Sequence, residues 1–302
     1  WLVFWASKVL KDSFKLPLIY TIHATEHGRN QGIHNSTQSY INDVEWYSTY
    51  EAWKVIVCSY YMKYEVQRLF HLPDDKLAVI NNGVDPEKFN TEVEDGFKDN
   101  FAHENEKIIF YVGRIVREKG VQYLLRAFSI ILHDMPEVKL VIAGKGPYVN
   151  MLKREANALG IENRVYFTGF ISDENRNKLY KTADLAVFPS IYEPFGIVAL
   201  EAMAAKIPLI TTNAGGLDEF VKDGENALKV NTADPFQLAG AILKILHDPL
   251  RAEEMANRAY EEVINIHNWD KIADQTYQLY KGVLSDYNQS SWQKNIKKEQ
   301  IK

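Results

Sequence analysis

The chain has 302 residues, 46 % of them hydrophobic, and a formal net charge of −5. This length suits two α/β domains, and the hydrophobic content argues against disorder over most of the chain. A slightly acidic protein does not fit a general nucleic-acid-binding surface, which is usually basic. The single cysteine, Cys58, excludes an internal disulfide and favours a cytoplasmic location. Without a run of 18 apolar residues, no membrane-spanning helix is expected.

The first region, residues 1–84, alternates short apolar runs with helical stretches. At its start, one face of a helix is expected from Leu2, Val3, Phe4, Val9 and Leu10. Short buried runs separated by helices are typical of parallel strands. Strands are therefore expected at 16–23, 54–58 and 77–80, with an aromatic-rich helix at 40–53.

Residues 85–106 are acidic, with eight Asp or Glu and two Lys. We expect a linker or a solvated connecting helix here. The predicted first domain, with this linker, covers residues 1–100.

The remaining chain alternates strand and helix patterns, which predicts a doubly wound parallel sheet. Asp234-Pro235 and Asp248-Pro249 each indicate a helix start, because Asp caps the first turn and Pro suits its first position. Strands are expected at 107–112, 138–143, 164–168, 184–188, 208–211 and 226–230, and a helix at 122–132. This second domain covers 101–268. Residues 269–302 form a last amphipathic helix, at 269–284, and a polar tail from Ser285 that is expected to be frayed or disordered.

Ligands of such sheets bind at the carboxyl ends of the strands, so the segments after each strand are the candidates. The stretch GRIVREKG follows 107–112, and its Gly113, Arg114 and Lys119 offer close backbone approach and positive charge for a diphosphate. GKGP, beginning at Gly144, follows 138–143. For GRIVREKG the simpler alternative is a turn with solvated cations. For GKGP it is a plain strand-to-helix turn.

The sharpest signal follows 184–188, where EPFGIVALE places Glu193 at a strand end and Glu201 in the next helix. Gly196 lies near the helix start, whose free N–H groups can bind phosphate. A carboxylate at Glu201 can accept hydrogen bonds from a ribose, and one at Glu193 can do the same for a sugar. In the alternative, both carboxylates only complement the helix dipole.

Two further segments are weaker candidates. Residues 211–219, TTNAGGLDE, contain paired glycines that permit close approach to a ligand or form an ordinary turn. In the first region, His23 ends a predicted strand, where it is either a structural histidine or part of a cleft.

At these residues the chain resembles the retaining glycosyltransferases of family 4 (group 1), including their glycogen-synthase-like members. Their architecture, called GT-B, has two facing Rossmann-like domains with doubly wound parallel sheets. The resemblance covers nearly the whole chain and is most specific at EPFGIVALEAMA. Supporting matches, in order, are TIHATEHGRNQGI, GRIVREKG, LVIAGKGP, VYFTGFIS, ADLAVFPS and PLITTNAGGLDEFV.

This resemblance implies roles for individual residues. Arg114 and Lys119 would hold the donor diphosphate, with Gly113 and Gly144 beside it. Glu193 would bind the transferred sugar, and Glu201 the ribose. His23 would act from the first domain, close to the donor sugar. The C-terminal helix of residues 269–302 would cross back to the first domain. The backbone of Phe195, Gly196, Ile197 and Val198 would touch sugar and phosphate, and Phe170 and Ile171 would lie near the base.

The resemblance also implies an ADP- or UDP-sugar donor, a glycan acceptor and no further cofactor. No metal is expected, since the chain lacks an Asp-x-Asp triplet and a Cys/His cluster, and two cations and a helix start can stabilise the leaving diphosphate. Such enzymes begin with a strand and a Gly-rich loop, so roughly 80 to 100 residues of the first domain are expected to be missing, which makes that domain incomplete. Donor binding should survive on the second domain, while catalysis by this chain alone stays open.

Three hypotheses for the function therefore remain. The first is transfer of a sugar, with glucose favoured, to a glycan such as an α-glucan. The second is another enzyme of this fold, such as a sugar phosphorylase or a sugar-nucleotide epimerase. The third is a nucleotide-sugar-binding fragment without activity.

Overall fold

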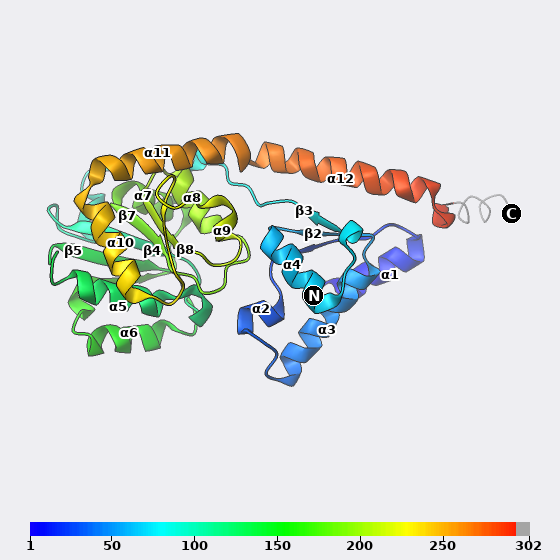
Figure 1. The fold of residues 1–302 in the computed structure, drawn as a ribbon, viewed down its shortest axis with the longest axis horizontal. Coiled ribbons are helices and arrows are strands. Elements are labelled where there is room, and N and C mark those ends of the chain that lie inside the picture. The colour runs from blue at the N-terminus through cyan, green and yellow to red at the C-terminus, as the bar shows by residue number, and fades with distance from the viewer. Residues whose placement is uncertain (294–302) are drawn as a thin grey trace. The chain divides into compact units, whose positions relative to one another are not determined.

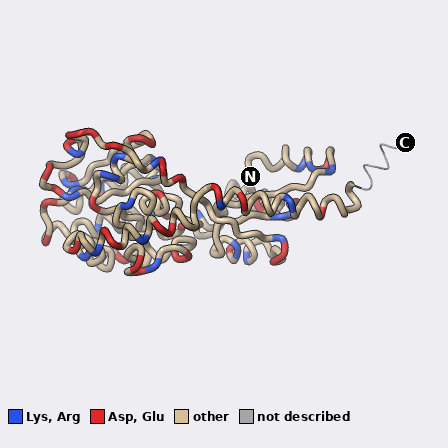
Figure 2. The backbone as a smooth tube through the Cα atoms, turned by 90° about the horizontal axis from the view of Figure 1, so that it is seen from above, with Lys and Arg blue, Asp and Glu red and all other residues tan. Residues whose placement is uncertain are grey.

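The computed structural model describes residues 1–293 and divides into two compact α/β units (Figure 1). Unit 1 comprises Trp1–Asn82 together with the segment from Trp269 onward, and unit 2 comprises Gly83–Asn268. Within residues 1–293, no helix combines the length and the apolar character needed to cross a membrane. Basic and acidic positions are intermingled along the backbone of both units (Figure 2).

Unit 1 is built on a parallel sheet in the order β1-β2-β3. Its strands are β1 (Ile19–Ile22), β2 (Lys54–Val57) and β3 (Leu77–Val79), so all three predicted strands are present but shorter than expected. Its helices are α1 (Phe4–Phe14), α2 (Glu26–Asn30), α3 (Ser36–Glu51), α4 (Tyr60–Phe70) and α12 (Trp269–Gln289), with a 3₁₀ turn, η1 (Asp74–Lys76). The side chains of Asn35 and Ser59 cap α3 and α4 by accepting the N–H groups of Gln38 and Met62.

Helix α12 packs on the sheet of unit 1. Ile272 shares a buried cluster with Ile56 of β2 and Ile80. The expectation of a frayed tail from Ser285 is wrong for 285–289, which are helical, because the ring of Tyr287 lies 6.0 Å from that of Trp53 and gives the last turn a packing partner. Residues 294–302 of that predicted tail lie outside the described residues.

The predicted apolar face of α1 is wrong. The helix begins only at Phe4, and Val9 and Leu10 are 63 % and 55 % exposed. Phe4 and the next positions on its side of the helix, Lys8 and Lys11, face α3 instead, since both lysines form ion pairs with Glu51 at 2.9 and 2.5 Å. The charged positions therefore decide which face packs.

Unit 2 contains a six-stranded parallel sheet in the order β6-β5-β4-β7-β8-β9. The strands are β4 (Lys107–Val112), β5 (Val138–Ala143), β6 (Val165–Gly169), β7 (Leu185–Phe188), β8 (Leu209–Thr212) and β9 (Leu228–Val230). All six lie where the apolar runs predict them, which confirms the parallel α/β fold class. The strand order reverses between β4 and β7, and ligands of open α/β sheets bind at such a reversal.

Helices cover this sheet (Figure 1). They are α5 (Val121–Ile131), α6 (Val149–Ala158), α7 (Asp173–Thr182), α8 (Ile197–Ala204), α9 (Leu217–Phe220), α10 (Pro235–His247) and α11 (Pro249–Ile266). The predicted helix at 122–132 is present as α5. The predicted caps are also confirmed, since Asp234 and Asp248 accept the N–H groups of Gln237 and Arg251 and each precedes a proline.

The acidic segment 85–106 is neither a linker nor a solvated helix. It forms two 3₁₀ turns, η2 (Pro86–Phe89) and η3 (Phe97–Asn100). The whole segment belongs to unit 2, although residues up to 100 were expected in the first domain. Phe89 and Phe97 are buried, and the side-chain amide of Asn177 in α7 donates to the carbonyl of Lys88 at 2.7 Å. The two phenylalanines anchor the segment despite its charge.

Two further 3₁₀ turns of unit 2 are η4 (Arg117–Lys119) and η5 (Glu162–Arg164).

Candidate active site

The carboxyl ends of β4, β5 and β6 meet in closely spaced glycine turns. The amide of Gly113 donates to the carbonyl of Ala143 at 3.0 Å, and that of Gly144 donates to Gly169 at 2.7 Å. A Cβ on Gly144, whose φ is +138°, would lie 1.8 Å from the carbonyl oxygen of Gly113. Packing alone therefore requires glycine at 144. The close turns after β4, β5 and β6, called the strand-end rim below, leave backbone groups that a ligand can approach.

Two cations follow β4 in different settings. Arg114 is exposed, and its guanidinium has no ion-pair or hydrogen-bond partner within residues 1–293, while its carbonyl accepts the hydroxyl of Tyr111 at 3.1 Å. Burial, together with the charges of Glu193 and Glu118, raises the pKa of Tyr111, so this hydroxyl stays protonated and fixes the turn. Lys119, at the end of η4, points its Nζ to Glu193, 2.6 Å from Oε2. One cation is thus free at the rim and the other is anchored.

Glu193 is a buried carboxylate, 6 % exposed, just beyond β7. Its Oε2 also accepts the hydroxyl of Ser190 at 3.1 Å, and its carbonyl accepts the amide of Gly216 at 2.8 Å. A charge this buried is stable only when paired and hydrogen-bonded. Within the described residues Oε1 has no partner, so one oxygen is fixed and the other is left for hydroxyl groups of a ligand.

The loop from Glu193 leads into α8 through two crowded glycines. Gly196 caps α8 with a φ of +108°, and a Cβ there would lie 2.4 Å from Leu217. A Cβ on Gly216 would lie 2.3 Å from the carbonyl oxygen of Pro194. Ile197 and Val198 then form the first turn of α8, whose N–H groups lack helical partners and favour an anion.

The side chain of Phe195 lies in the core and not at the rim. Its ring is 5.3 Å from Phe220 and 6.1 Å from His267, centre to centre. Only the backbone of Phe195 is therefore available to a ligand, which is the part that the resemblance implies.

Glu201 has a different environment from Glu193. Its Oε1 lies 3.5 Å from the guanidinium of Arg176, and the hydroxyl of Tyr180 donates to its Oε2 at 3.3 Å. Burial raises the pKa of Glu201, while the neighbouring charge of Arg176 and the hydrogen bond from Tyr180 lower it. Both contacts are long, so the carboxylate can still accept hydroxyl groups.

The remaining predicted residues of unit 2 follow β6. Phe170 is 72 % exposed, and the ammonium group of Lys145 lies 5.5 Å from the centre of its ring. Ile171 is half-buried. An exposed ring at a strand end is available for stacking on a planar base.

In unit 1, His23 follows β1 and is exposed, and two buried carboxylates hold the turn after it. The hydroxyl of Thr25 donates to Glu65 at 2.5 Å and caps α2 by accepting the amide of Gly28 at 2.8 Å. Glu45 accepts the amide of Glu26 at 2.9 Å, and burial raises the pKa of Glu45 to about 7.

Sequence reasoning missed several of these partners. The residues that it did not single out are Ser190, Arg176, Tyr180, Glu45 and Glu65. Arg176 and Tyr180 stand four positions apart on α7, and that spacing places them on one helix face. Nothing in the local pattern points to Glu45 or Glu65, because polar positions of a helix are normally solvated.

Within residues 1–293, no group of three His, Cys, Asp or Glu side chains is placed to hold a metal ion. The prediction of a metal-free site stays a prediction.

The sequence matches two families of known proteins. "Glycosyl transferases group 1" matches residues 92–262, and "Glycosyltransferase Family 4" matches residues 1–88. An uncharacterised glycosyltransferase of Methanocaldococcus jannaschii is 38 % identical over 286 residues, covering 93 % of this chain and 73 % of that protein. A glycogen synthase of Mycobacterium tuberculosis is 33 % identical over 281 residues, covering 93 % of this chain, which spans 66 % of that enzyme's length.

Solved structures show the same fold. Sucrose-phosphate synthase from Thermosynechococcus elongatus has a TM-score of 0.81 and 29 % identity, covering 95 % of this chain and 72 % of its own. An Anabaena protein in complex with UDP and glucose has a TM-score of 0.80 at 22 % identity, covering 93 % of this chain and 75 % of its own, and shows the fold alone. The GT-B fold class is thereby confirmed. The chain belongs to the group 1 glycosyltransferases of family 4, which use nucleotide-sugar donors.

Proposed function

We propose that this chain binds the donor of a retaining, metal-independent glucosyl transfer from ADP- or UDP-glucose to an α-glucan-like acceptor. The observation that carries the proposal is the Lys119–Glu193 pair beside the free N–H groups of α8. The similarity to a glycogen synthase supports the choice of sugar and acceptor. We also propose a cytoplasmic protein, in keeping with the buried free thiol of Cys58.

In the proposed reaction the bond between the anomeric carbon and the diphosphate oxygen breaks as the acceptor hydroxyl attacks from the same face, and the proton of that hydroxyl passes to the leaving diphosphate. Negative charge then grows on the leaving diphosphate. Arg114, Lys119 and the first turn of α8 stabilise that charge, and Lys119 and the helix start do so without reorganisation because they are already held in place. Glu193 accepts hydroxyl groups of the glucose through Oε1, while Glu201 accepts those of the ribose. His23 acts on the donor sugar from unit 1.

Calorimetric titration of the purified chain with ADP, UDP, ADP-glucose and UDP-glucose, all with EDTA, tests the donor site. Selective binding of one nucleotide at roughly micromolar concentration is expected, and it would identify the base. Phosphate-dependent turnover without nucleotide would instead favour a phosphorylase. Failure of all four ligands to bind would contradict the assignment of Glu193 and Glu201. Donor binding without transfer would leave a binding fragment as the function of this chain.

A further inference from the structure

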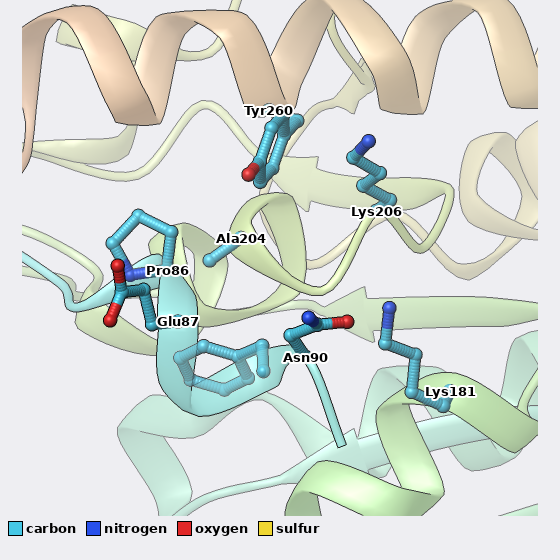
Figure 3. Close-up of a pocket in the computed structure, with 8 residues that line it drawn as sticks. Pro86, Glu87, Asn90, Lys181, Ala204, Lys206 and Tyr260 are labelled. Atoms are coloured by element: carbon cyan, nitrogen blue, oxygen red, sulfur yellow. The ribbon is translucent and has the colours of Figure 1, made fainter. Parts of the chain in front are cut away.

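Unit 2 contains a pocket of about 530 Å³ that the proposed donor site does not use. Helices α7 and α8 begin at the strand-end rim, and the pocket lies at their opposite ends, where Lys181 and Lys206 are found. Figure 3 shows its wall, with Tyr260 from α11, and with Glu87 and Asn90 at and just after η2. A volume of this size is ordinary for a small-molecule site.

The polar groups of the pocket lack protein partners. Within residues 1–293, neither Lys181 nor Lys206 has an ion pair, and the side chains of Glu87 and Asn90 have no hydrogen bond. The ammonium group of Lys206 lies 4.2 Å from the centre of the Tyr260 ring. Lysines at helix ends also complement the helix dipole, and Lys244 at the end of α10 is such a residue outside the pocket. The pocket differs from such a helix end because it gathers two unpaired cations, a carboxylate, an amide and an aromatic ring, with the polar side chains at exposed positions.

We propose that this pocket binds a small sugar phosphate as an effector of nucleotide binding. Lys181 and Lys206 bind the phosphate through charge-assisted hydrogen bonds. The sugar hydroxyls bind the amide of Asn90 and the carboxylate of Glu87, and an apolar sugar face packs near Tyr260.

The pocket wall is linked to Glu201 by direct contacts. The ring of Phe89, which lines the pocket, lies 6.0 Å from the ring of Tyr180 and 5.8 Å from the guanidinium carbon of Arg176. Within residues 1–293, Tyr180 and Arg176 are the polar partners of the Glu201 carboxylate. In this proposal, a ligand seated against Phe89 holds the partners of Glu201 in place and so raises nucleotide affinity. This coupling rests on the proposed role of Glu201, whereas the pocket's own ligand does not.

Calorimetric titration of the chain with mannose 6-phosphate, inorganic phosphate and mannose tests the binding. The sugar phosphate should bind with a Kd of roughly 0.1 to 1 mM, phosphate more weakly and mannose without detectable heat. Lys206→Gly and Lys181→Gln should each weaken binding about tenfold. Lys244→Gln is the matched control and should change nothing.

The Lys206→Gly variant separates binding from folding. Lys206 has a φ of +57°, where glycine is favoured, so the thermal midpoint should not fall. Absence of binding, or equal binding by all variants, would refute the pocket as the site.

The coupling is tested by titrating the nucleotide with and without saturating mannose 6-phosphate. We expect about fivefold tighter nucleotide binding with the sugar phosphate, and loss of this gain in Phe89→Leu. Unchanged nucleotide affinity would overturn the effector role. Failure of any nucleotide to bind would count against the proposed function, and the separate titration of the pocket would still decide the site.

Discussion

The two units hold buried carboxylates in opposite ways. In unit 2, Glu193 is 6 % exposed and lies 2.6 Å from the ammonium group of Lys119. In unit 1, Glu45 is 3 % exposed, accepts one backbone amide and has no ion pair within residues 1–293. The two carboxylates are buried to a similar extent, but only Glu193 has a cation in direct contact within the described residues.

That difference separates a carboxylate with a contact cation from one whose environment favours the protonated form. The ammonium group of Lys119 offsets part of the cost of burying Glu193. Burial raises the pKa of Glu45 to about 7, and the charge of Arg29 opposes this only in part. Four experiments test the roles of these carboxylates and of Glu201.

The largest effect should come from Glu193→Ala. If the carboxylate binds the sugar in the transition state, transfer should slow roughly 100- to 1000-fold, with a smaller loss of nucleotide affinity. Steady-state rates and calorimetry on the same preparation measure the two quantities. Glu45→Gln, which keeps a hydrogen-bond acceptor, is the control and should retain the rate. A rate equal to that of the unaltered chain would remove Glu193 from the site.

Lys119→Met should make Glu193 an unpaired buried charge. We expect a loss of about 3 kcal/mol in the free energy of unfolding, measured with urea at pH 8. The double variant Lys119→Met/Glu193→Met replaces both charges and should recover most of this loss. If the single and double variants are equally unstable, the pair itself does not matter for stability.

Glu45→Gln should stabilise unit 1 at neutral and higher pH. The pKa of Glu45 rises from 4.5 to about 7 in the folded protein, which therefore holds more protons than the unfolded chain between these values. The free energy of unfolding should fall as pH rises through this window, by about 2 to 3 kcal/mol in total. The variant should lose this slope in thermal melts from pH 4 to 8. A slope that persists in Glu45→Gln would assign it to another group.

The smallest effect should come from Glu201→Ala. If Glu201 holds the ribose, nucleotide affinity should fall about tenfold, or about 1.4 kcal/mol, with a smaller effect on transfer at saturating donor. Titration with the selected nucleotide measures it. Tyr180→Phe removes one hydrogen bond to Glu201 and should weaken binding less. Equal and negligible effects of Glu193→Ala and Glu201→Ala would contradict the whole site assignment.

Local pattern explains why the strands of unit 2 were predictable. The apolar runs at β4 and β5 are long enough to fill the centre of a parallel sheet, and Asp-Pro pairs mark the starts of α10 and α11. These signals act over a few residues. The same reasoning failed for residues 85–106, because the burial of Phe89 and Phe97 depends on helices that come much later in the chain.

The amino-acid sequence was enough to predict the α/β alternation, the strand-end positions of the motifs and the motif that holds Glu193 and Glu201 with seven residues between them. Which charges meet depends on the folded arrangement of elements that are distant in the chain. Lys119 and Glu193 are 74 positions apart, and Glu201 receives its partners from α7. The folded arrangement also decided that Lys8 and Lys11, not Val9 and Leu10, face α3. Period and capping act within one element, whereas the pairing of charges and the choice of a buried face depend on elements distant in the chain.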